Sequence, residues 1–286
     1  MASDLTSADL RLAAGPVDLT AIDSGATPGF AGGKSEGKAA LMALGDDLSD
    51  LQERLFAEGV SDVGHGRAVL LVLQGMDTSG KGGVLRHTVG LVDPQGVSIT
   101  SFKAPTEEEL ANDFLWRIRK ALPTKGRIGV FDRSHYEDVL IARVRELAPP
   151  EEIERRYDAI NAFEVEAVGA GITVIKCMLH ISADTQKERL LARLDDPAKH
   201  WKFNPQDVDE RALWPDYRDA YEIALERTNT EVAPWYVVPS DHKWYRNLAI
   251  GNLLHETLLG MNPQWPVADF DVEEQKRRLL DEGRIS

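Results

Sequence analysis

The sequence predicts an α/β fold in which helices flank a central parallel sheet. Short apolar runs rich in strand-forming residues alternate with longer segments whose apolar residues recur at helical spacing, as is typical of such sheets. The first run, residues 68–73, leads directly into a glycine-rich loop that ends in Lys81, and a helical pattern follows. This strand–loop–helix order around a G-x-x-x-x-G-K motif predicts a phosphate-binding P-loop.

The 286 residues, 43% of them hydrophobic and 28% charged, suit one large folded domain. A net charge of -14 excludes roles that rest on an overall positive field, so an anionic ligand needs a local basic site. The single cysteine, Cys177, cannot form an intrachain disulfide, and no Cys/His cluster suggests zinc. No signal-like segment or membrane-length apolar run is evident, so we expect a cytoplasmic protein that binds neither nucleic acid nor membrane.

Residues 1–37, rich in small residues, are expected to form an extended N-terminal arm or to be partly disordered, and residues 38–286 to form the domain. Leucines at helical spacing predict a first helix over residues 38–59, which Gly59 ends. The predicted strands cover residues 68–73, 97–102, 128–131, 172–179 and 235–238. The predicted helices between them cover residues 106–122, 134–147, 151–169 and 183–195.

Two of these helices begin with the same pair of residue types. Glu109 follows Thr106 by three positions, and Glu137 follows Ser134 by three positions. A hydroxyl residue and a glutamate at this spacing can form a capping box, which explains these residues without a catalytic role. His135 lies in the first turn of the second helix, where a packing role suits it better than phosphoryl transfer.

The glycine-rich loop carries the main chemical signal. Its glycines let backbone N–H groups turn towards phosphate oxygens, and Lys81 adds a full positive charge. One position departs from the usual motif: Gly82 stands where a serine or threonine would offer Mg²⁺ a hydroxyl, so the ion needs other protein ligands. The residues expected to contact phosphate or nucleotide in this loop are Gly75, Met76, Asp77, Thr78, Ser79, Gly80, Lys81 and Gly82.

Two aspartates are the expected ligands of Mg²⁺, with Mn²⁺ as an alternative ion. Asp77 lies in the loop, and Asp132 follows the apolar run at residues 128–131, the usual place of a second acidic residue. Arg133 adds a cation where the charge of a transferring phosphoryl group must be stabilised. Asp77 also suits a turn-stabilising role, and this alternative stays open. The expected catalytic residues are Asp77, Lys81, Asp132 and Arg133.

Two basic segments are unusual in so acidic a chain. Among the cations between residues 114 and 133, Arg117 is a predicted phosphate contact, whereas its neighbours suit a solvated surface. After the fourth strand, Arg189 and Arg193 are four residues apart and share one side of a helix. With Lys199 and Lys202 they predict a lid, about residues 183–210, that closes over a polyanion. A surface helix held by salt bridges explains this spacing equally well.

Several stretches of the chain resemble the polyphosphate kinase 2 family. They are residues 75–83 (GMDTSGKGG), 131–139 (FDRSHYEDV), 186–193 (QKERLLAR) and 196–203 (DPAKHWKF), and residues 233–241 and 243–246 are similar to the family's last strand and following helix. The resemblance covers about residues 38–266. It implies a thymidylate-kinase-like P-loop kinase fold with a helical lid, Mg²⁺ held by Asp77 and Asp132, and phosphates held by Lys81, Arg133 and the lid cations.

The resemblance also implies the reaction. Family members transfer the terminal phosphoryl group of inorganic polyphosphate to nucleotides, with Mg²⁺, by reversible in-line displacement. Residues 196–205 resemble members that accept nucleoside monophosphates as well as diphosphates, so AMP and ADP are the expected acceptors, with GMP and GDP as alternatives. A homo-oligomer, either a dimer or a tetramer, is expected as well.

Two other functions suit the same residues. An ATP-dependent nucleoside or small-molecule kinase of the same fold would need a general base for a hydroxyl acceptor, and Glu137 is the nearest candidate. Glu137 is also an expected nucleotide contact. A regulator that binds nucleotide or polyphosphate without reaction would have little use for the two carboxylates.

Overall fold

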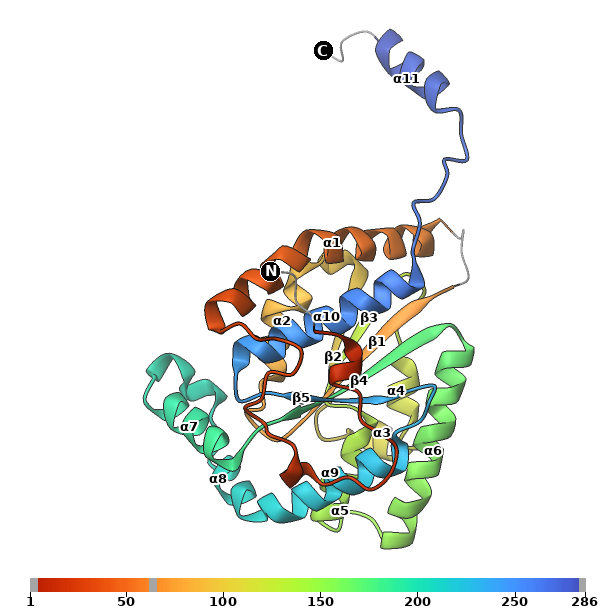
Figure 1. Ribbon diagram of the computed structural model, residues 1–286. Helices are drawn as coiled ribbons and strands as arrows, with labels where there is room; N and C mark the ends of the chain where they lie inside the picture. The colour runs from red at the N-terminus through yellow and green to blue at the C-terminus, as the bar shows by residue number, and fades with distance from the viewer. Residues whose placement is uncertain (1–4, 62–65, 283–286) are drawn as a thin grey trace.

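The computed structural model describes residues 5–61 and 66–282, and its centre is a parallel sheet (Figure 1). The strands lie in the order β2-β3-β1-β4-β5 and every pairing is parallel. The predicted α/β fold is confirmed, and each predicted strand ends within one residue of the observed one. The strands are β1 (Ala68–Gln74), β2 (Val97–Ser101), β3 (Ile128–Asp132), β4 (Ile172–His180) and β5 (Trp235–Pro239).

The central strand, β1, is buried along its whole length between β3 and β4. Its register places Leu73 opposite Asp132 on one side and Cys177 on the other. The N–H of Arg133 then donates to the Leu73 carbonyl at 3.2 Å. This register brings the carboxyl end of β3 beside the start of the glycine-rich loop, the edge at which parallel sheets usually bind ligands.

Helices cover both faces of the sheet (Figure 1). Alternate strand residues supply two cores, with Leu71 and Ile175 on one face and Leu70 and Val174 on the other. The first face is covered by α1 (Lys34–Val60), α2 (Lys81–His87) and α10 (Lys243–Met261), and the second by α5 (Ile141–Val144), α6 (Pro150–Gly169) and α9 (Trp214–Thr228). The other α-helices of the described chain are α3 (Glu107–Leu110), α4 (Trp116–Lys120), α7 (Ala183–Leu194), α8 (Gln206–Glu210) and α11 (Val272–Asp281).

Two predicted helices are interrupted in the structure. The helix predicted over residues 106–122 is divided into α3 and α4, because the Asp113 side chain accepts a hydrogen bond from the Leu115 N–H and starts a new turn. The helix predicted over residues 134–147 is instead a short 3₁₀ turn, His135–Asp138, followed by α5. Apolar residues of these segments are buried in the core as predicted, but the continuous helices do not form.

The two predicted capping boxes have different outcomes. In the first, the Glu109 carboxylate accepts from the Thr106 N–H at 2.8 Å, and the Thr106 hydroxyl accepts from the Glu109 N–H at 3.3 Å. The box predicted for Ser134 and Glu137 is wrong, because the Ser134 hydroxyl accepts from the Tyr136 N–H and Glu137 lines a cavity. Glu137 therefore belongs to the candidate site rather than to a helix cap.

The N-terminal segment lies along the outer edge of β5. The N–H of Val237 donates to the Leu10 carbonyl at 2.9 Å, which extends the sheet by a short bridge. Leu5, Leu10 and Leu19 are buried against the domain. The arm, described from residue 5, includes two short 3₁₀ turns, Ser7–Asp9 and Leu19–Ala21, and packs against the domain. It covers a strand edge that would otherwise be exposed.

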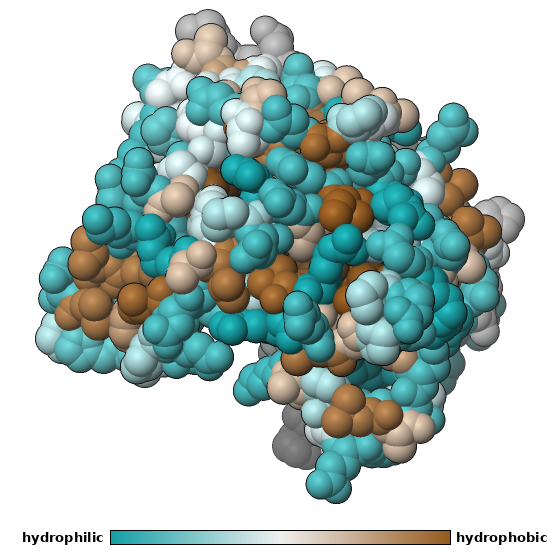
Figure 2. All heavy atoms as spheres, turned by 90° about the horizontal axis from the view of Figure 1, so that it is seen from below, coloured by the Kyte–Doolittle hydropathy of each residue, from teal (hydrophilic) through white to brown (hydrophobic). Residues whose placement is uncertain are grey.

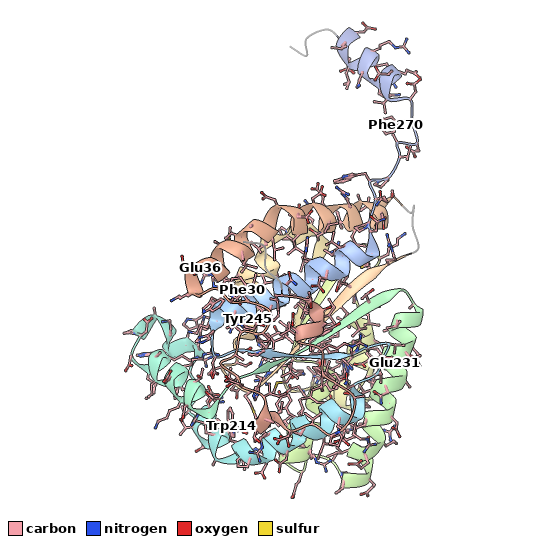
Figure 3. The ribbon with its side chains drawn as sticks, in the orientation of Figure 1. Phe30, Glu36, Trp214, Glu231, Tyr245 and Phe270 are labelled. Carbon is pink, nitrogen blue, oxygen red and sulfur yellow. The ribbon has the colours of Figure 1, made fainter. Side chains whose placement is uncertain are left out.

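Two labelled residues in Figure 3 show how differently the two ends of the chain lie. The Tyr245 hydroxyl on α10 donates to the Pro28 carbonyl at 2.7 Å, so the N-terminal segment is held against the domain. Phe270, in contrast, lies in the segment that leads away from the domain to α11. Over residues 5–61 and 66–282, no helix has the length and apolar character needed to cross a membrane.

Candidate active site

The loop between β1 and α2 has a backbone that depends on its glycines. Gly75 and Gly80 have φ angles of 150° and 110°, and a Cβ at Gly80 would lie 1.7 Å from Nη1 of Arg246. Thr78 has a φ of 63°, and such strain in a residue other than glycine is common at functional sites. The Lys81 ammonium group donates to the Gly75 carbonyl at 2.8 Å. The predicted loop is thus a strained turn whose two ends are joined by the hydrogen bond from Lys81 to Gly75.

Lys81 is surrounded by charges of both signs. Burial lowers the pKa of Lys81 and the charge of Arg133 lowers it further, whereas the carboxylates of Asp77 and Asp132 oppose this shift. Asp77 comes from the loop and Asp132 from the end of β3, yet both act on the same ammonium group. Arg133 contacts Asp77, Lys81 closes the same loop, and Asp132 directly precedes Arg133, so the four predicted catalytic residues lie at one edge of the sheet.

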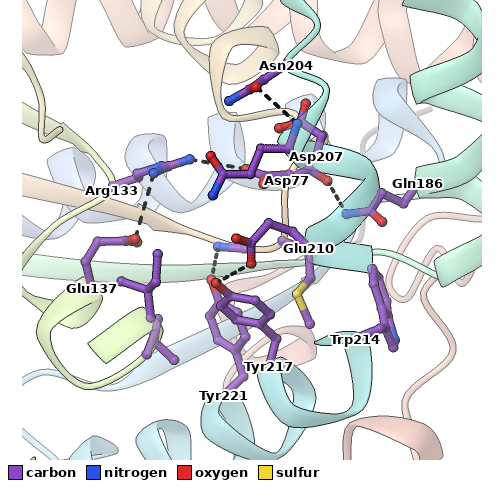
Figure 4. A pocket seen from close by; sticks show the side chains of 15 residues that line it. Asp77, Arg133, Glu137, Gln186, Asn204, Asp207, Glu210, Trp214, Tyr217 and Tyr221 are labelled. Atoms are coloured by element: carbon purple, nitrogen blue, oxygen red, sulfur yellow. Dashed lines mark hydrogen bonds and ion pairs between the residues drawn. The ribbon is translucent and has the colours of Figure 1, made fainter. Parts of the chain in front are cut away.

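Arg133 joins the loop to the turn that follows β3 (Figure 4). Its guanidinium lies 3.2 Å from Oδ1 of Asp77 and 3.9 Å from Oε2 of Glu137. Burial works against the charge of Arg133, but the carboxylates of Glu137 and Asp77 outweigh it and raise the pKa of Arg133. Burial raises the pKa of Glu137 in turn, although Arg133 and Lys81 oppose this shift. Arg133 is held at the site by two carboxylates.

A cavity of about 210 Å³ opens beside the loop (Figure 4). Arg133 is the one cation among its described lining residues, and the acidic ones are Asp77, Glu137, Asp207 and Glu210. The aromatic wall is formed by Trp214, Tyr217 and Tyr221, and the Tyr221 hydroxyl accepts from the Gly75 N–H at 3.0 Å. Carboxylates accept hydrogen bonds and aromatic rings stack, so this cavity suits a flat ligand that carries N–H and O–H groups.

Arg189, a predicted lid cation, braces the loop from α7. Its guanidinium donates to the carbonyls of Thr78 and Ser79 at 2.9 and 3.1 Å, and to those of Ser240 and Asp241 at 2.5 and 2.9 Å. These contacts tie the middle of α7 to the loop and to the segment after β5. Arg189 is therefore placed to support the phosphate-binding backbone, whereas direct contact with polyphosphate stays a prediction.

The other predicted lid cations contact residues of the lid itself. Arg193 donates to the Lys202 carbonyl at 2.9 Å, and Lys199 lies 2.7 Å from Oδ2 of Asp196. The Lys202 ammonium group lies 4.9 Å from the centre of the Trp201 ring. These contacts match the salt-bridged surface alternative as well as a lid. The phosphate contacts of these three cations stay predictions.

The lid segment also exposes apolar surface. Leu191, Leu194 and Val208 are each about half exposed. Figure 2 shows hydrophobic side chains gathered at the left of the face seen from below, the side on which α7 and α8 lie in Figure 1. This surface would be available for burial if the lid closed.

Arg117, the remaining predicted phosphate contact, is occupied by local partners. Its guanidinium donates to the Lys103 carbonyl at 2.9 Å, lies 3.5 Å from Oε2 of Glu109 and stacks on the Phe102 ring. These contacts connect α4 to the segment after β2. They explain Arg117 without phosphate, so its predicted role has no support from the geometry.

Sequence reasoning missed a basic groove of about 1000 Å³ that borders Gly83 on α2, just after the loop. Burial lowers the pKa of Lys243, and neighbouring cations, including Arg189, Arg246 and Lys199, lower it further. Burial likewise lowers the pKa of Arg246 to about 9. Such crowding disfavours the charged forms until an anion binds. The cationic lining residues are Lys34, Lys38, Lys243 and Arg246, and His87, His242 and the acidic Asp241 line the groove as well.

The donor set at the loop fits Mg²⁺. This ion is usually held by one or two carboxylates together with substrate phosphates, and Asp77 and Asp132 provide two. Across residues 5–61 and 66–282, no three His, Cys, Asp or Glu side chains are grouped closely enough to hold a metal ion by themselves. The site therefore suits an ion that the substrate phosphates help to coordinate.

Asp138, next to Glu137, allows a prediction about stability. It lies 3.7 Å from Arg156 and 3.9 Å from Arg117, yet burial raises its pKa from 3.8 to about 6. An acid whose pKa is raised by folding binds its proton more tightly in the folded state. Its contribution to stability is therefore present below pH 3.8 and lost as the pH rises through 6.

Asp138→Asn should escape this loss. The free energy of unfolding of the variant minus that of the original chain should increase by about 2–3 kcal/mol from about pH 4 to pH 7.5. Urea unfolding at both pH values measures the change. An equal difference between the two proteins at both pH values would contradict it.

Comparisons with known proteins agree with the resemblance of the motifs. The sequence model of the family described as Polyphosphate kinase 2 (PPK2) matches residues 33–266. The AMP/ADP-polyphosphate phosphotransferase of Meiothermus ruber is 46% identical over 91% of this chain and 95% of its own length. The ADP-polyphosphate phosphotransferase of Rhodopseudomonas palustris is 43% identical over 77% of this chain and 78% of its own length.

A solved structure extends this similarity to the fold. The crystal structure of polyphosphate kinase 2 from Arthrobacter aurescens TC1 covers 99% of each chain with a TM-score of 0.94 and 51% identity. The match includes the parallel sheet, its flanking helices and the loop between β1 and α2.

Proposed function

The chain belongs to the polyphosphate kinase 2 family, with a P-loop kinase-like fold, and we propose that it transfers the terminal phosphoryl group of inorganic polyphosphate to AMP and ADP. One observation carries the choice of substrates: the P-loop lies between two cavities of opposite character. The groove is basic and borders Gly83, whereas the smaller cavity is acidic and aromatic and borders Gly75. A long polyanion needs a basic groove, and a nucleoside needs aromatic rings and hydrogen-bond acceptors.

Polyphosphate, as the donor, lies in the basic groove. The groove brings Lys34 and Lys38 from α1 close to Lys243 from α10, two helices that are far apart in the sequence. Arg246 connects the groove to the loop, because its Nη1 donates to the Ser79 carbonyl at 3.0 Å. A chain of phosphates in the groove relieves the repulsion among these cations and places its last anhydride at the P-loop.

The acceptor nucleotide lies in the smaller cavity. Its base and ribose meet the aromatic wall and the carboxylates of Asp207 and Glu210, which accept hydrogen bonds from amino and hydroxyl groups. Its phosphate points towards Arg133, the cation of this cavity. GMP and GDP remain alternative acceptors, since carboxylates also bind the N–H groups of guanine.

The residues between the two cavities perform the transfer by positioning and by charge stabilisation. Lys81 and Arg133 stabilise the negative charge on the oxygens of the transferring group. Asp77 and Asp132 hold Mg²⁺, which neutralises phosphate charge when bound; Mn²⁺ is the alternative ion. The acceptor phosphate is already anionic and needs no general base, so Glu137 orients Arg133 instead. The reaction is an in-line displacement and is reversible.

The direct test uses the purified chain with polyphosphate and Mg²⁺. AMP should yield ADP, and ADP should yield ATP, while parallel reactions with GMP and GDP measure the choice of base. The reactions without polyphosphate, with ATP and nucleosides as substrates, test the ATP-dependent kinase alternative. Absence of nucleotide product from every acceptor would reject the proposal.

Replacement of groove lysines should affect the donor selectively. We expect Lys38→Ala with Lys243→Ala to raise the KM for long-chain polyphosphate by about tenfold or more, because two charges are removed from the groove. The KM for AMP should change little, and the effect should shrink at high salt. Lys276→Ala, on the distant α11, is the matched control. Equal changes in both KM values would contradict the division into donor and acceptor sites.

Three further features stay predictions from the sequence. We propose that the lid, about residues 183–210, closes over bound polyphosphate. Assembly into a dimer or tetramer is measurable by light scattering. A cytoplasmic location fits an enzyme that uses nucleotides, and fractionation of cells tests it.

A further inference from the structure

A charged pair is buried beneath the candidate site. Nζ of Lys176, on β4, lies 2.6 Å from Oε2 of Glu164, on α6, and the two side chains are 0% and 1% exposed. The ammonium group also donates to the Tyr136 hydroxyl at 3.0 Å and to the Thr228 carbonyl at 2.7 Å. The Tyr136 hydroxyl donates to Oε1 of Glu164 at 2.7 Å, and Nε2 of His135 lies 3.4 Å from that oxygen. Two consecutive residues of the turn after β3 therefore contact the pair.

Lys176 occupies a position that the sheet would normally fill with an apolar residue. Its neighbours on the same face of β4 are Val174 and Met178, both buried in the core under α6. Burial alone would raise the pKa of Glu164, but the charge of Lys176 and the hydrogen bonds lower it, so the carboxylate is ionised at neutral pH. An apolar pair of similar size is often at least as stable as a buried ion pair. Stability alone therefore does not explain this pair.

The 3₁₀ turn after β3 connects the pair to the reacting groups. Arg133 precedes this turn and Glu137 lies in it, and both side chains line the smaller cavity (Figure 4). The Ser134 hydroxyl accepts from the Tyr136 N–H at 3.2 Å and lies 2.9 Å from the Gln74 amide. The turn is thus fixed to β1 through Gln74, and to β4 and α6 through Tyr136.

We propose that Lys176, Glu164 and Tyr136 are positioning residues that hold this turn so that Arg133 faces the transferring phosphoryl group. The inference rests on the phosphoryl transfer proposed above. Arg133 has a φ of 65°, a conformation that persists only where surrounding contacts hold it. The buried pair provides such contacts because the ammonium group and the carboxylate fix the Tyr136 hydroxyl from two sides.

Tyr136→Phe is the first test, because it removes one hydroxyl and keeps the ring. We expect kcat to fall about tenfold or more, since small displacements of a reacting group are costly, while the KM for polyphosphate stays within about twofold. Tyr245→Phe is the matched control: it removes a buried hydroxyl that donates at 2.7 Å on the opposite face of the sheet. An unchanged kcat in Tyr136→Phe would overturn the proposal.

A double variant separates positioning from simple stability. Lys176→Met leaves the Glu164 carboxylate unpaired and should lower the melting temperature. Adding Glu164→Gln removes that buried charge and should restore most of the loss. We expect kcat to stay low in the double variant although its stability returns. Recovery of kcat together with the melting temperature would show that the pair is only structural.

Amide hydrogen exchange over residues 133–138 tests the turn without an activity assay. Exchange should be faster in Tyr136→Phe and in the double variant than in the original chain, and unchanged in Tyr245→Phe. An original chain that is inactive with every acceptor contradicts the proposed function. Unchanged exchange in the turn contradicts the positioning role.

Discussion

Asp132→Ala is expected to lower kcat for polyphosphate-dependent ADP formation by about 10²–10³-fold while the protein stays folded. Asp132 is at the end of β3, where its carboxylate acts on the Lys81 ammonium group together with that of Asp77. Removing it takes away one of two carboxylates proposed to hold Mg²⁺ at the transferring group. The strand itself should persist, because its pairing with β1 uses backbone bonds and apolar residues.

The measurement is a rate of ADP formation over a range of Mg²⁺ concentrations. The Mg²⁺ concentration for half-maximal rate should rise, and saturating Mg²⁺ should restore only part of the activity, because the remaining carboxylate holds the ion less firmly. Asp158→Ala, at an exposed position of α6, is the matched control and should behave like the original chain. A folded Asp132→Ala protein with near-normal kcat would contradict the metal assignment.

Lys81→Met is expected to cause a similar loss, about 10²–10³-fold in kcat/KM for polyphosphate. Its ammonium group both closes the loop through the Gly75 carbonyl and provides charge at the phosphates. The stability of the folded Lys81→Met protein without ligand, in contrast, should not fall. Because burial and Arg133 lower the pKa of Lys81, the folded state disfavours its charged form, and that cost is present at every pH at which the lysine is charged in the folded state.

The expected melting temperature of Lys81→Met in the absence of ligand is therefore equal to or higher than that of the original chain. Polyphosphate should raise the melting temperature of the original chain more than that of the variant, because ligands that bind only the folded state stabilise it. Lys276→Met on α11 serves as the control. A less stable variant with unchanged ligand stabilisation would show that Lys81 is a structural residue.

Much of the fold and the centre of the site could be predicted because their signals are local. The apolar run of β1 and the glycines that follow it are adjacent in the sequence, so one short segment predicts both the strand and the loop. Asp132 and Arg133 follow a second apolar run, and parallel strands end at the same edge of a sheet. Lys81 needs no more than its position after Gly80 in the motif.

The rest depends on contacts between distant segments. Glu137 has the spacing of a helix cap, but the turn after β3 is 3₁₀ and turns its carboxylate to Arg133. Arg189 lies on the same helix side as Arg193, but its guanidinium donates hydrogen bonds to backbone carbonyls of the loop, contacts that the spacing does not reveal. The lysine within the apolar run of β4 was a visible signal of the buried pair, but its partner on α6 could not be identified from spacing.

The basic groove was missed for the same reason. Its cations come from α1 and α10, at opposite ends of the domain sequence, and neither helix forms a dense basic cluster by itself. Only the packing of these helices on one face of the sheet brings Lys38 near Lys243. Net charge is no guide here, because -14 over the whole chain conceals a local basic surface.

In the proposed site, Asp77 and Asp132 would hold one divalent ion that neutralises the charge of the phosphates at the P-loop. A crystal grown with Mn²⁺, a non-hydrolysable polyphosphate analogue and AMP tests it most directly, because the anomalous signal locates the ion. We predict a single peak in contact with both carboxylates and with a phosphate oxygen beside Lys81. A metal ion bound elsewhere, or phosphates that lie away from residues 75–81, would contradict the account.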